Sequence, residues 1–118
     1  MKIYLAIPYT SPSKRTERFR HVIANEVAAS LISKGYIIYS PISHTHPIHE
    51  ACEGTITHSQ WLRLDTEFVK WADELWVLTL DGWEESRGVK YEIALAESLQ
   101  IPVRYLGAAD VENISRLD

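Results

Sequence analysis

The chain has 118 residues, of which 46% are hydrophobic and 24% are charged, and its formal net charge is −4. These values are typical of one globular domain over residues 1–118 and exclude a disordered chain. Because the sequence has no long basic run, we do not expect duplex nucleic acid as a partner. No apolar run resembles a secretory leader or reaches the roughly 20 residues of a membrane span, so we expect a cytoplasmic protein without membrane contact.

The first half of the chain predicts two strands around one long helix. Lys2–Ile7 is a short apolar run that Pro8 stops, which is typical of a buried strand. The helix that follows ends at Gly35. Its apolar face consists of Phe19, Val22, Ile23, Val27 and Leu31. Tyr36–Ser40 predicts the second strand, and a long polar loop is expected from there to about His58.

The second half predicts two more helices, each followed by a strand. The apolar faces of these helices are Trp61, Leu64, Phe68 and Ala72 in the first and Val89, Ile93, Ala96 and Leu99 in the second. Glu74–Leu80 is the most strand-like segment, and Asp81-Gly82 closes it as a turn. The next helix begins near Ser86, and Pro102–Leu106 predicts the fourth strand. A short helix is expected from Asp110.

Strands that alternate with helices predict a three-layer α/β sandwich, in which helices cover both faces of a parallel sheet. We expect four to five strands in the order 2-1-3-4, as in flavodoxin-like or Rossmann-like folds. Ligands bind such sheets beyond the carboxyl ends of the strands, where the strand order reverses. The loops Pro8–Arg15 and Asp81–Gly88 face that point, which makes Pro8, Tyr9 and Asp81 candidate substrate-binding residues.

Two acidic residues interrupt the apolar helix faces. Asp65 lies within the first of these faces and Glu92 within the second. An inward-facing carboxylate costs several kcal/mol unless it is paired or neutralised. One interpretation is a catalytic pair that acts on a glycosidic bond, with one carboxylate as nucleophile and the other as proton donor. The alternative is structural: each acid pairs with Arg63, Arg87 or Arg104, or lies at the solvated edge of the face.

The segment Ser86-Arg87-Gly88 is a candidate anion site at the start of a helix. Ser is a favoured N-cap, and the free backbone N–H groups of a first helical turn bind anions. Gly88 lets a phosphate approach the backbone closely. An ordinary capped helix without a ligand has the same pattern, so the pattern alone leaves both interpretations open.

Histidine and tryptophan side chains add further candidates. Four histidines follow the second strand: His44, His46, His49 and His58. No Glu-x-x-His pattern or cysteine ligand accompanies them, so we predict no metal site. Loop histidines are usually exposed, but His44 could contact a bound base or relay a proton. Trp83 lies beside the expected cleft, where it could stack on a base or only pack against the protein.

Four segments resemble the nucleoside 2-deoxyribosyltransferase superfamily, which includes the 2'-deoxynucleoside 5'-monophosphate N-glycosidases. These segments are Ile3–Tyr9, Tyr39–Ile42, Ala72–Val77 and Ser86–Ala96. The most specific feature is the Ser-x-Gly-x-x-x-Glu pattern in the last of them. Within the superfamily, the chain is most similar to a branch of small bacterial and phage proteins.

The resemblance implies roles for individual residues. Glu92 would attack the anomeric carbon of a deoxyribose and form a covalent glycosyl-enzyme, and Tyr4 would orient Glu92. Asp65 would protonate the departing base. Ser86 and the Gly88 amide would hold a 5'-phosphate or 5'-hydroxyl. The resemblance also implies a homo-oligomer, a dimer or tetramer, and we expect no cofactor.

Two residues depart from the pattern of this superfamily. Ile7 occupies a position where many members have Gly or another small residue, which would narrow the base pocket. Ser86 occupies a position where transferases often carry an acid, which favours a nucleotide over a free nucleoside. We therefore expect N-glycosidic bond cleavage of a deoxynucleoside 5'-monophosphate or nucleoside. The alternatives are base-exchange transfer and non-catalytic binding of a nucleotide or nucleotide-derived signal.

Overall fold

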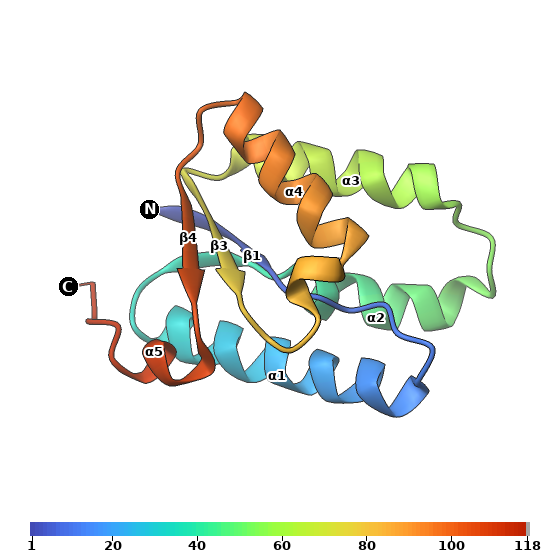
Figure 1. Cartoon of the computed structure of the whole chain (residues 1–118), viewed down its shortest axis with the longest axis horizontal. Helices are drawn as coiled ribbons and strands as arrows, with labels where there is room; N and C mark the ends of the chain where they lie inside the picture. Colours follow the sequence, from blue (N-terminus) through green and yellow to red (C-terminus); the bar gives the residue numbers. More distant parts are fainter. Residues whose placement is uncertain (118) are drawn as a thin grey trace.

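A parallel sheet lies at the centre of the computed structural model, which describes residues 1–117 (Figure 1). Its four strands are β1 (Lys2–Ala6), β2 (Ile37–Tyr39), β3 (Glu74–Leu78) and β4 (Val103–Leu106). They are arranged in the order β2-β1-β3-β4, and every neighbouring pair is parallel. The predicted three-layer α/β fold and its strand order are confirmed.

Helices connect the strands and begin at residues suited to capping. They are α1 (Lys14–Ser33), α2 (Pro41–Cys52), α3 (His58–Trp71), α4 (Arg87–Ser98) and α5 (Ala108–Glu112), with a 3-10 turn, η1, at Trp83–Glu85. Ser13, Thr57 and Ser86 each accept a hydrogen bond from a backbone N–H in the first turn of the helix that follows. None of the helices in residues 1–117 is long and apolar enough to cross a membrane.

Successive residues of β1 and β3 point to opposite faces of the sheet and form two separate cores. On one face, Leu5 and Trp76 lie in a core that contains buried residues of α1 and α5. On the other face, Tyr4 and Val77 lie in a core with residues of α3 and α4. This alternation directs the Tyr4 side chain toward α4, the helix that carries Glu92.

The polar loop expected after the second strand is instead the helix α2, so that prediction was wrong. Pro41 occupies the first turn of this helix, where its missing N–H and fixed φ are tolerated. Pro41 and Ile42 are its only buried residues, and Pro47 lies in its interior. The segment therefore shows almost no apolar periodicity, the signal on which helix prediction depends.

The predicted apolar face of α1 is also partly wrong. Phe19 and Val22 are 59% and 49% exposed. The buried face consists of Ala24, Val27, Ala28 and Leu31. A helix of 20 residues is about 30 Å long, whereas a strand of five residues spans only about 17 Å, so the first turns of α1 extend past the sheet (Figure 1).

Candidate functional site

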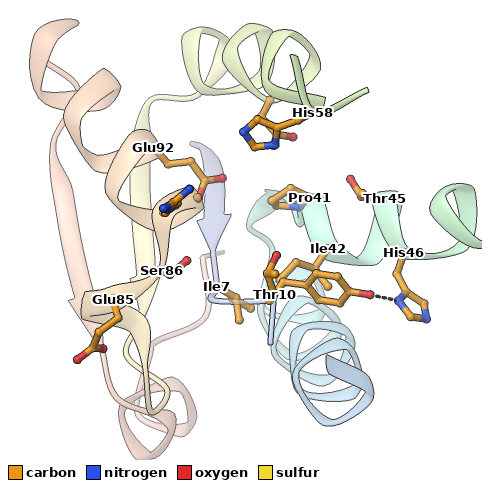
Figure 2. Close-up of a pocket in the computed structure, with 14 residues that line it drawn as sticks. Ile7, Thr10, Pro41, Ile42, Thr45, His46, His58, Glu85, Ser86 and Glu92 are labelled. Carbon is orange, nitrogen blue, oxygen red and sulfur yellow. Dashed lines mark hydrogen bonds between the residues drawn. The ribbon is translucent and has the colours of Figure 1, made fainter. Parts of the chain in front are cut away.

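A cavity of about 450 Å³ opens beyond the carboxyl ends of the strands, between α4 on one side and α2 and α3 on the other (Figure 2). It is lined by Ile7, Tyr9, Thr10, Pro41, Ile42, Thr45, His46, His58, Asp65, Glu85, Ser86, Arg87, Gly88 and Glu92. These residues come from the segments that follow β1, β2 and β3 and from α2, α3 and α4. This is the edge of the sheet that the strand order indicates for a ligand.

Glu92 presents a buried carboxyl group to this cavity from α4. It is only 6% exposed, and the hydroxyl of Tyr4 on β1 donates a hydrogen bond to its Oε2. Among the ion pairs of residues 1–117, none includes Glu92 or Asp65. A neutral donor rather than a cation therefore holds the Glu92 side chain, so the arginine pairing of the structural alternative is not formed.

Burial determines the protonation of this site. It raises the pKa of Glu92 to about 8, although the hydrogen bond from Tyr4 opposes the shift and the nearby Asp65 adds to it. Burial also raises the pKa of Asp65 to about 6. The pKa of Tyr4 is raised well above its ordinary value by burial and by Glu92, so its hydroxyl keeps the proton that it donates. Two carboxyl groups with separated pKa values are a common basis for acid–base chemistry.

Asp65 and Tyr39 each carry a buried oxygen that has no protein partner. Within residues 1–117, neither Asp65 Oδ1 nor the Tyr39 hydroxyl makes a hydrogen bond. The Tyr39 ring is fixed by stacking on Phe68, with 3.8 Å between the ring centroids and 8° between the planes. An unsatisfied buried polar group costs about 1–3 kcal/mol, which a contact with a ligand would offset. Of these two residues, Asp65 lines the cavity and Tyr39 does not. Tyr39 was not among the residues predicted for the site.

The N-terminus of α4 forms part of the cavity wall through Ser86, Arg87 and Gly88. The Ser86 Oγ accepts a hydrogen bond from the N–H of Val89 at 3.2 Å. A Cβ atom added to Gly88 would contact only this Oγ, at 3.9 Å, so the backbone at Gly88 is open to a ligand. Arg87 also lines the cavity and forms no ion pair with another residue of the described chain. The free N–H groups and the guanidinium together suit a phosphate.

Four predicted binding residues lie outside the cavity lining. Pro8 is fully buried and does not line the cavity. Asp81 is exposed, and its backbone carbonyl accepts a hydrogen bond from Arg20. Trp83 packs against Tyr105, with 5.4 Å between ring centroids, because η1 turns its side chain toward the core.

His44, the fourth, is exposed and contacts the Tyr39 ring at a centroid distance of 5.8 Å. Because this segment is helical, a position two residues further along lies about 200° around the helix axis. His46, and not His44, therefore lines the cavity, together with His58 from the start of α3. In residues 1–117, no group of three or more acidic, His or Cys side chains is placed to hold a metal ion.

Arg20 joins the two loops at the edge of the cavity, a role that the sequence did not reveal. Its guanidinium donates to the carbonyls of Tyr9 and Thr10 at 3.3 and 3.2 Å, and to that of Asp81 at 2.9 Å. Glu17, one turn earlier, accepts a hydrogen bond from the Ser11 N–H at 3.0 Å. The long helix α1 thus fixes the loop that carries Tyr9.

We expect Arg20→Ala to loosen this loop and to destabilise the fold. Loss of three hydrogen bonds from a charged donor should lower the free energy of unfolding by about 1–3 kcal/mol. Thermal unfolding measures this loss, and hydrogen exchange should quicken at residues 9–13. Arg15→Ala, an exposed change on the same helix, is the control. Equal effects of the two substitutions would contradict the assigned role of Arg20.

Comparisons with known proteins agree with this architecture. A family model described as a domain of unknown function, DUF1937, matches residues 1–108. This family is part of the nucleoside 2-deoxyribosyltransferase-like superfamily, which confirms the resemblance found in the sequence. Among solved structures, the chain is similar to the 2-deoxyribosyltransferase of Bacillus psychrosaccharolyticus, with 20% sequence identity and a TM-score of 0.61. The match covers 91% of this chain and 72% of that one and shows a shared fold. No curated protein matches the chain significantly.

Proposed function

We propose that the chain cleaves the N-glycosidic bond of a deoxynucleoside 5'-monophosphate. The premise is that it belongs to the DUF1937 family of the nucleoside 2-deoxyribosyltransferase-like superfamily. The observation that carries the proposal is the buried Glu92, held by Tyr4 without a cation and accompanied by Asp65 in one cavity. A volume of about 450 Å³ is within the range of small-molecule sites. The similar fold of a 2-deoxyribosyltransferase supports nucleoside chemistry.

The reaction would proceed in two displacements at the anomeric carbon. A carboxylate oxygen of Glu92 forms a bond to this carbon while the bond to the base breaks, and the electron pair stays on the base nitrogen. Asp65 supplies the proton that the base takes up. Water then attacks the same carbon and gives its proton to Asp65, and the ester bond to Glu92 breaks. The products are the free base and 2-deoxyribose 5-phosphate, with retained configuration.

The protonation of the two acids has to change when the substrate binds. In the empty site the higher pKa belongs to Glu92, about 8 against about 6 for Asp65, so Glu92 holds the proton first. Such a pair titrates as a unit. Positive charge that develops at the anomeric carbon favours the ionised form of Glu92 and leaves the proton to Asp65. Asp65 lines the cavity and forms no ion pair within residues 1–117, so no cation competes for the proton that it would deliver to the base.

The phosphate would bind at the start of α4, and this can be tested at Ser86. Base release from deoxynucleoside monophosphates is measured by chromatography, with the matching nucleosides as comparison. Ser86→Asp keeps a favourable N-cap but places a negative charge beside the phosphate. We expect it to reduce the preference for monophosphates over nucleosides by about tenfold or more, which corresponds to at least ~1.4 kcal/mol. Ser86→Asn, a neutral cap, is the control.

The same assay distinguishes the alternative functions. Release of one base only when a second base is added would indicate transfer rather than hydrolysis. Nucleotide binding without any release, in both wild type and Glu92→Gln, would assign the cavity to a binding protein and overturn the proposal.

A further inference from the structure

We propose that the cavity selects a base whose outer edge carries an amino group, because His46 and Glu50 fix Tyr9 as a hydrogen-bond acceptor. The inference rests on the proposed function and adds the class of base to it. It concerns the wall formed by α2 and the loop after β1. Figure 2 shows His46 on the side of the cavity opposite Glu92, where the base of a nucleotide would lie if its sugar contacted Glu92.

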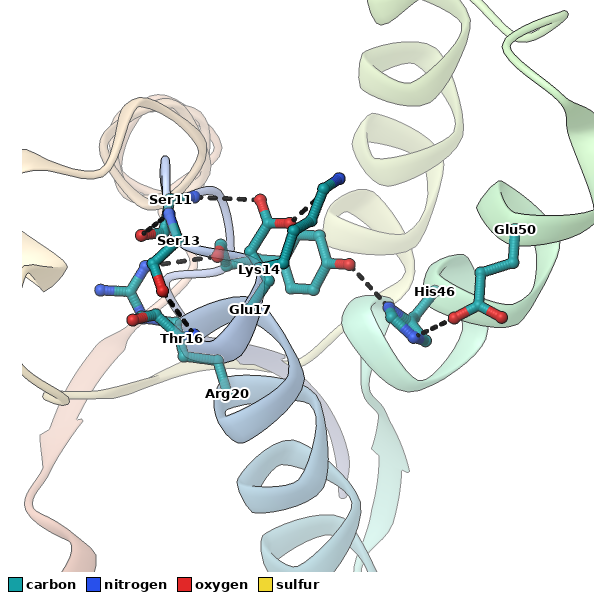
Figure 3. Close-up of polar contacts among 9 residues, drawn as sticks. Ser11, Ser13, Lys14, Thr16, Glu17, Arg20, His46 and Glu50 are labelled. Atoms are coloured by element: carbon teal, nitrogen blue, oxygen red, sulfur yellow. Dashed lines mark hydrogen bonds and ion pairs between the residues drawn. The ribbon is translucent and has the colours of Figure 1, made fainter.

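Three side chains form a continuous hydrogen-bonded array in this wall (Figure 3). The Tyr9 hydroxyl lies 2.6 Å from His46 Nδ1, and His46 Nε2 lies 2.6 Å from a carboxylate oxygen of Glu50. His46 and Glu50 are one helical turn apart on α2. The His46 side chain is only 15% exposed, and its ring stacks on His21 with 4.0 Å between the centroids. Hydrogen-bond partners at both ring nitrogens and stacking on His21 therefore hold the His46 ring in place.

When the His46 ring is neutral, the hydrogen bonds of this array allow only one placement of its protons. A carboxylate only accepts hydrogen bonds, so Glu50 requires the proton of the ring to be on Nε2. Nδ1 is then an acceptor, and the single proton of the Tyr9 hydroxyl points toward it. Burial raises the pKa of Tyr9, and the negative charges of Glu17 and Glu50 raise it further, so the phenol keeps this proton. The lone pairs that remain on the Tyr9 oxygen can only accept.

This fixed polarity distinguishes two kinds of base. An exocyclic amine, as in cytosine or adenine, donates to the Tyr9 oxygen. A carbonyl at the same position, as in uracil or hypoxanthine, would face an oxygen that has no proton to offer. Thr10 and Thr45 also line the cavity, but hydroxyls that rotate freely accept or donate and do not discriminate. Because an unpaired buried polar group is costly, the base with the carbonyl should be disfavoured by roughly tenfold to a hundredfold.

Matched nucleotides test the inference. dCMP and dUMP differ at one exocyclic group, as do dAMP and dIMP. We would measure base release, and also dissociation constants with Glu92→Gln, at about pH 8. In wild type the amino member of each pair should be preferred about tenfold or more. Tyr9→Phe should abolish the preference, and Glu50→Gln should weaken it because an amide can also donate to His46. Glu26→Gln, an exposed change on α1, should leave it intact.

The two readouts separate this inference from the proposed function. Equal release from both members of each pair, or a preference for the carbonyl member, would overturn the inference and leave hydrolysis standing. If no nucleotide is cleaved, the proposed function fails, and the dissociation constants still decide the selectivity. If neither member binds, both proposals are wrong. A preference that survives Tyr9→Phe would show that another residue reads the base.

Discussion

Glu92→Gln is expected to reduce base release by roughly 10³-fold or more while nucleotide affinity stays within about threefold of wild type. The amide has nearly the shape of the protonated acid and can still accept the hydrogen bond from Tyr4, so the cavity should remain intact. It cannot attack the anomeric carbon, and no covalent intermediate can form. Chromatography of the released base, with a binding titration of the same nucleotide, measures both quantities.

Glu97→Gln is the matched control because it makes the same substitution at an exposed position on the same helix. We expect its activity to equal that of wild type. If Glu92→Gln kept more than about a tenth of the activity, a nucleophilic role for Glu92 would be excluded. The reaction, if observed, would then have to begin with direct attack of water on the sugar.

The sequence predicted those parts of the site that follow from local patterns. Asp65 and Glu92 were found because a carboxylate within an apolar helix face contradicts the period of that face. Ser86 was found because it combines an N-cap with a following glycine. The strand order followed from the alternation of strands and helices, which leaves few allowed connections. In each case the signal lies within a few neighbouring residues of the chain.

Other parts of the site depend on packing between distant segments. The Tyr39 hydroxyl has no hydrogen-bond partner within residues 1–117, and burial and the charge of Asp65 raise its pKa, but strand periodicity does not show this. Arg20 meets the carbonyl of Asp81, 61 positions away, and the contact needs the complete fold. His46 was treated as one of several loop histidines because α2 was not predicted. Once that segment is helical, the pairing of His46 with Glu50 follows from their i,i+4 spacing.

Glu92 should also make the stability of the fold depend on pH. The pKa of this group rises from its ordinary value of 4.5 to about 8 in the folded protein, chiefly because it is buried. Between these values the unfolded chain releases the proton while the native state keeps it. The unfolded state then binds fewer protons, so the free energy of unfolding falls as pH rises through this window and levels off above about pH 8. The buried carboxylate thus weakens the fold at the pH where it is available for chemistry.

We therefore expect Glu92→Gln to remove a decline of roughly 2 kcal/mol between pH 6 and pH 8, or about 8 °C in Tm for a domain of this size. Asp65 adds little above pH 6, because its own raised pKa is about 6. The pKa of His21 is lowered by burial and gives a slope of opposite sign, but it cancels when the variant is compared with wild type. Thermal unfolding at both pH values supplies the difference, and Glu97→Gln should behave as wild type. Parallel pH profiles for wild type and Glu92→Gln would mean that the Glu92 carboxyl group is not buried in solution, and the buried, cation-free carboxyl group on which the proposed chemistry depends would not exist.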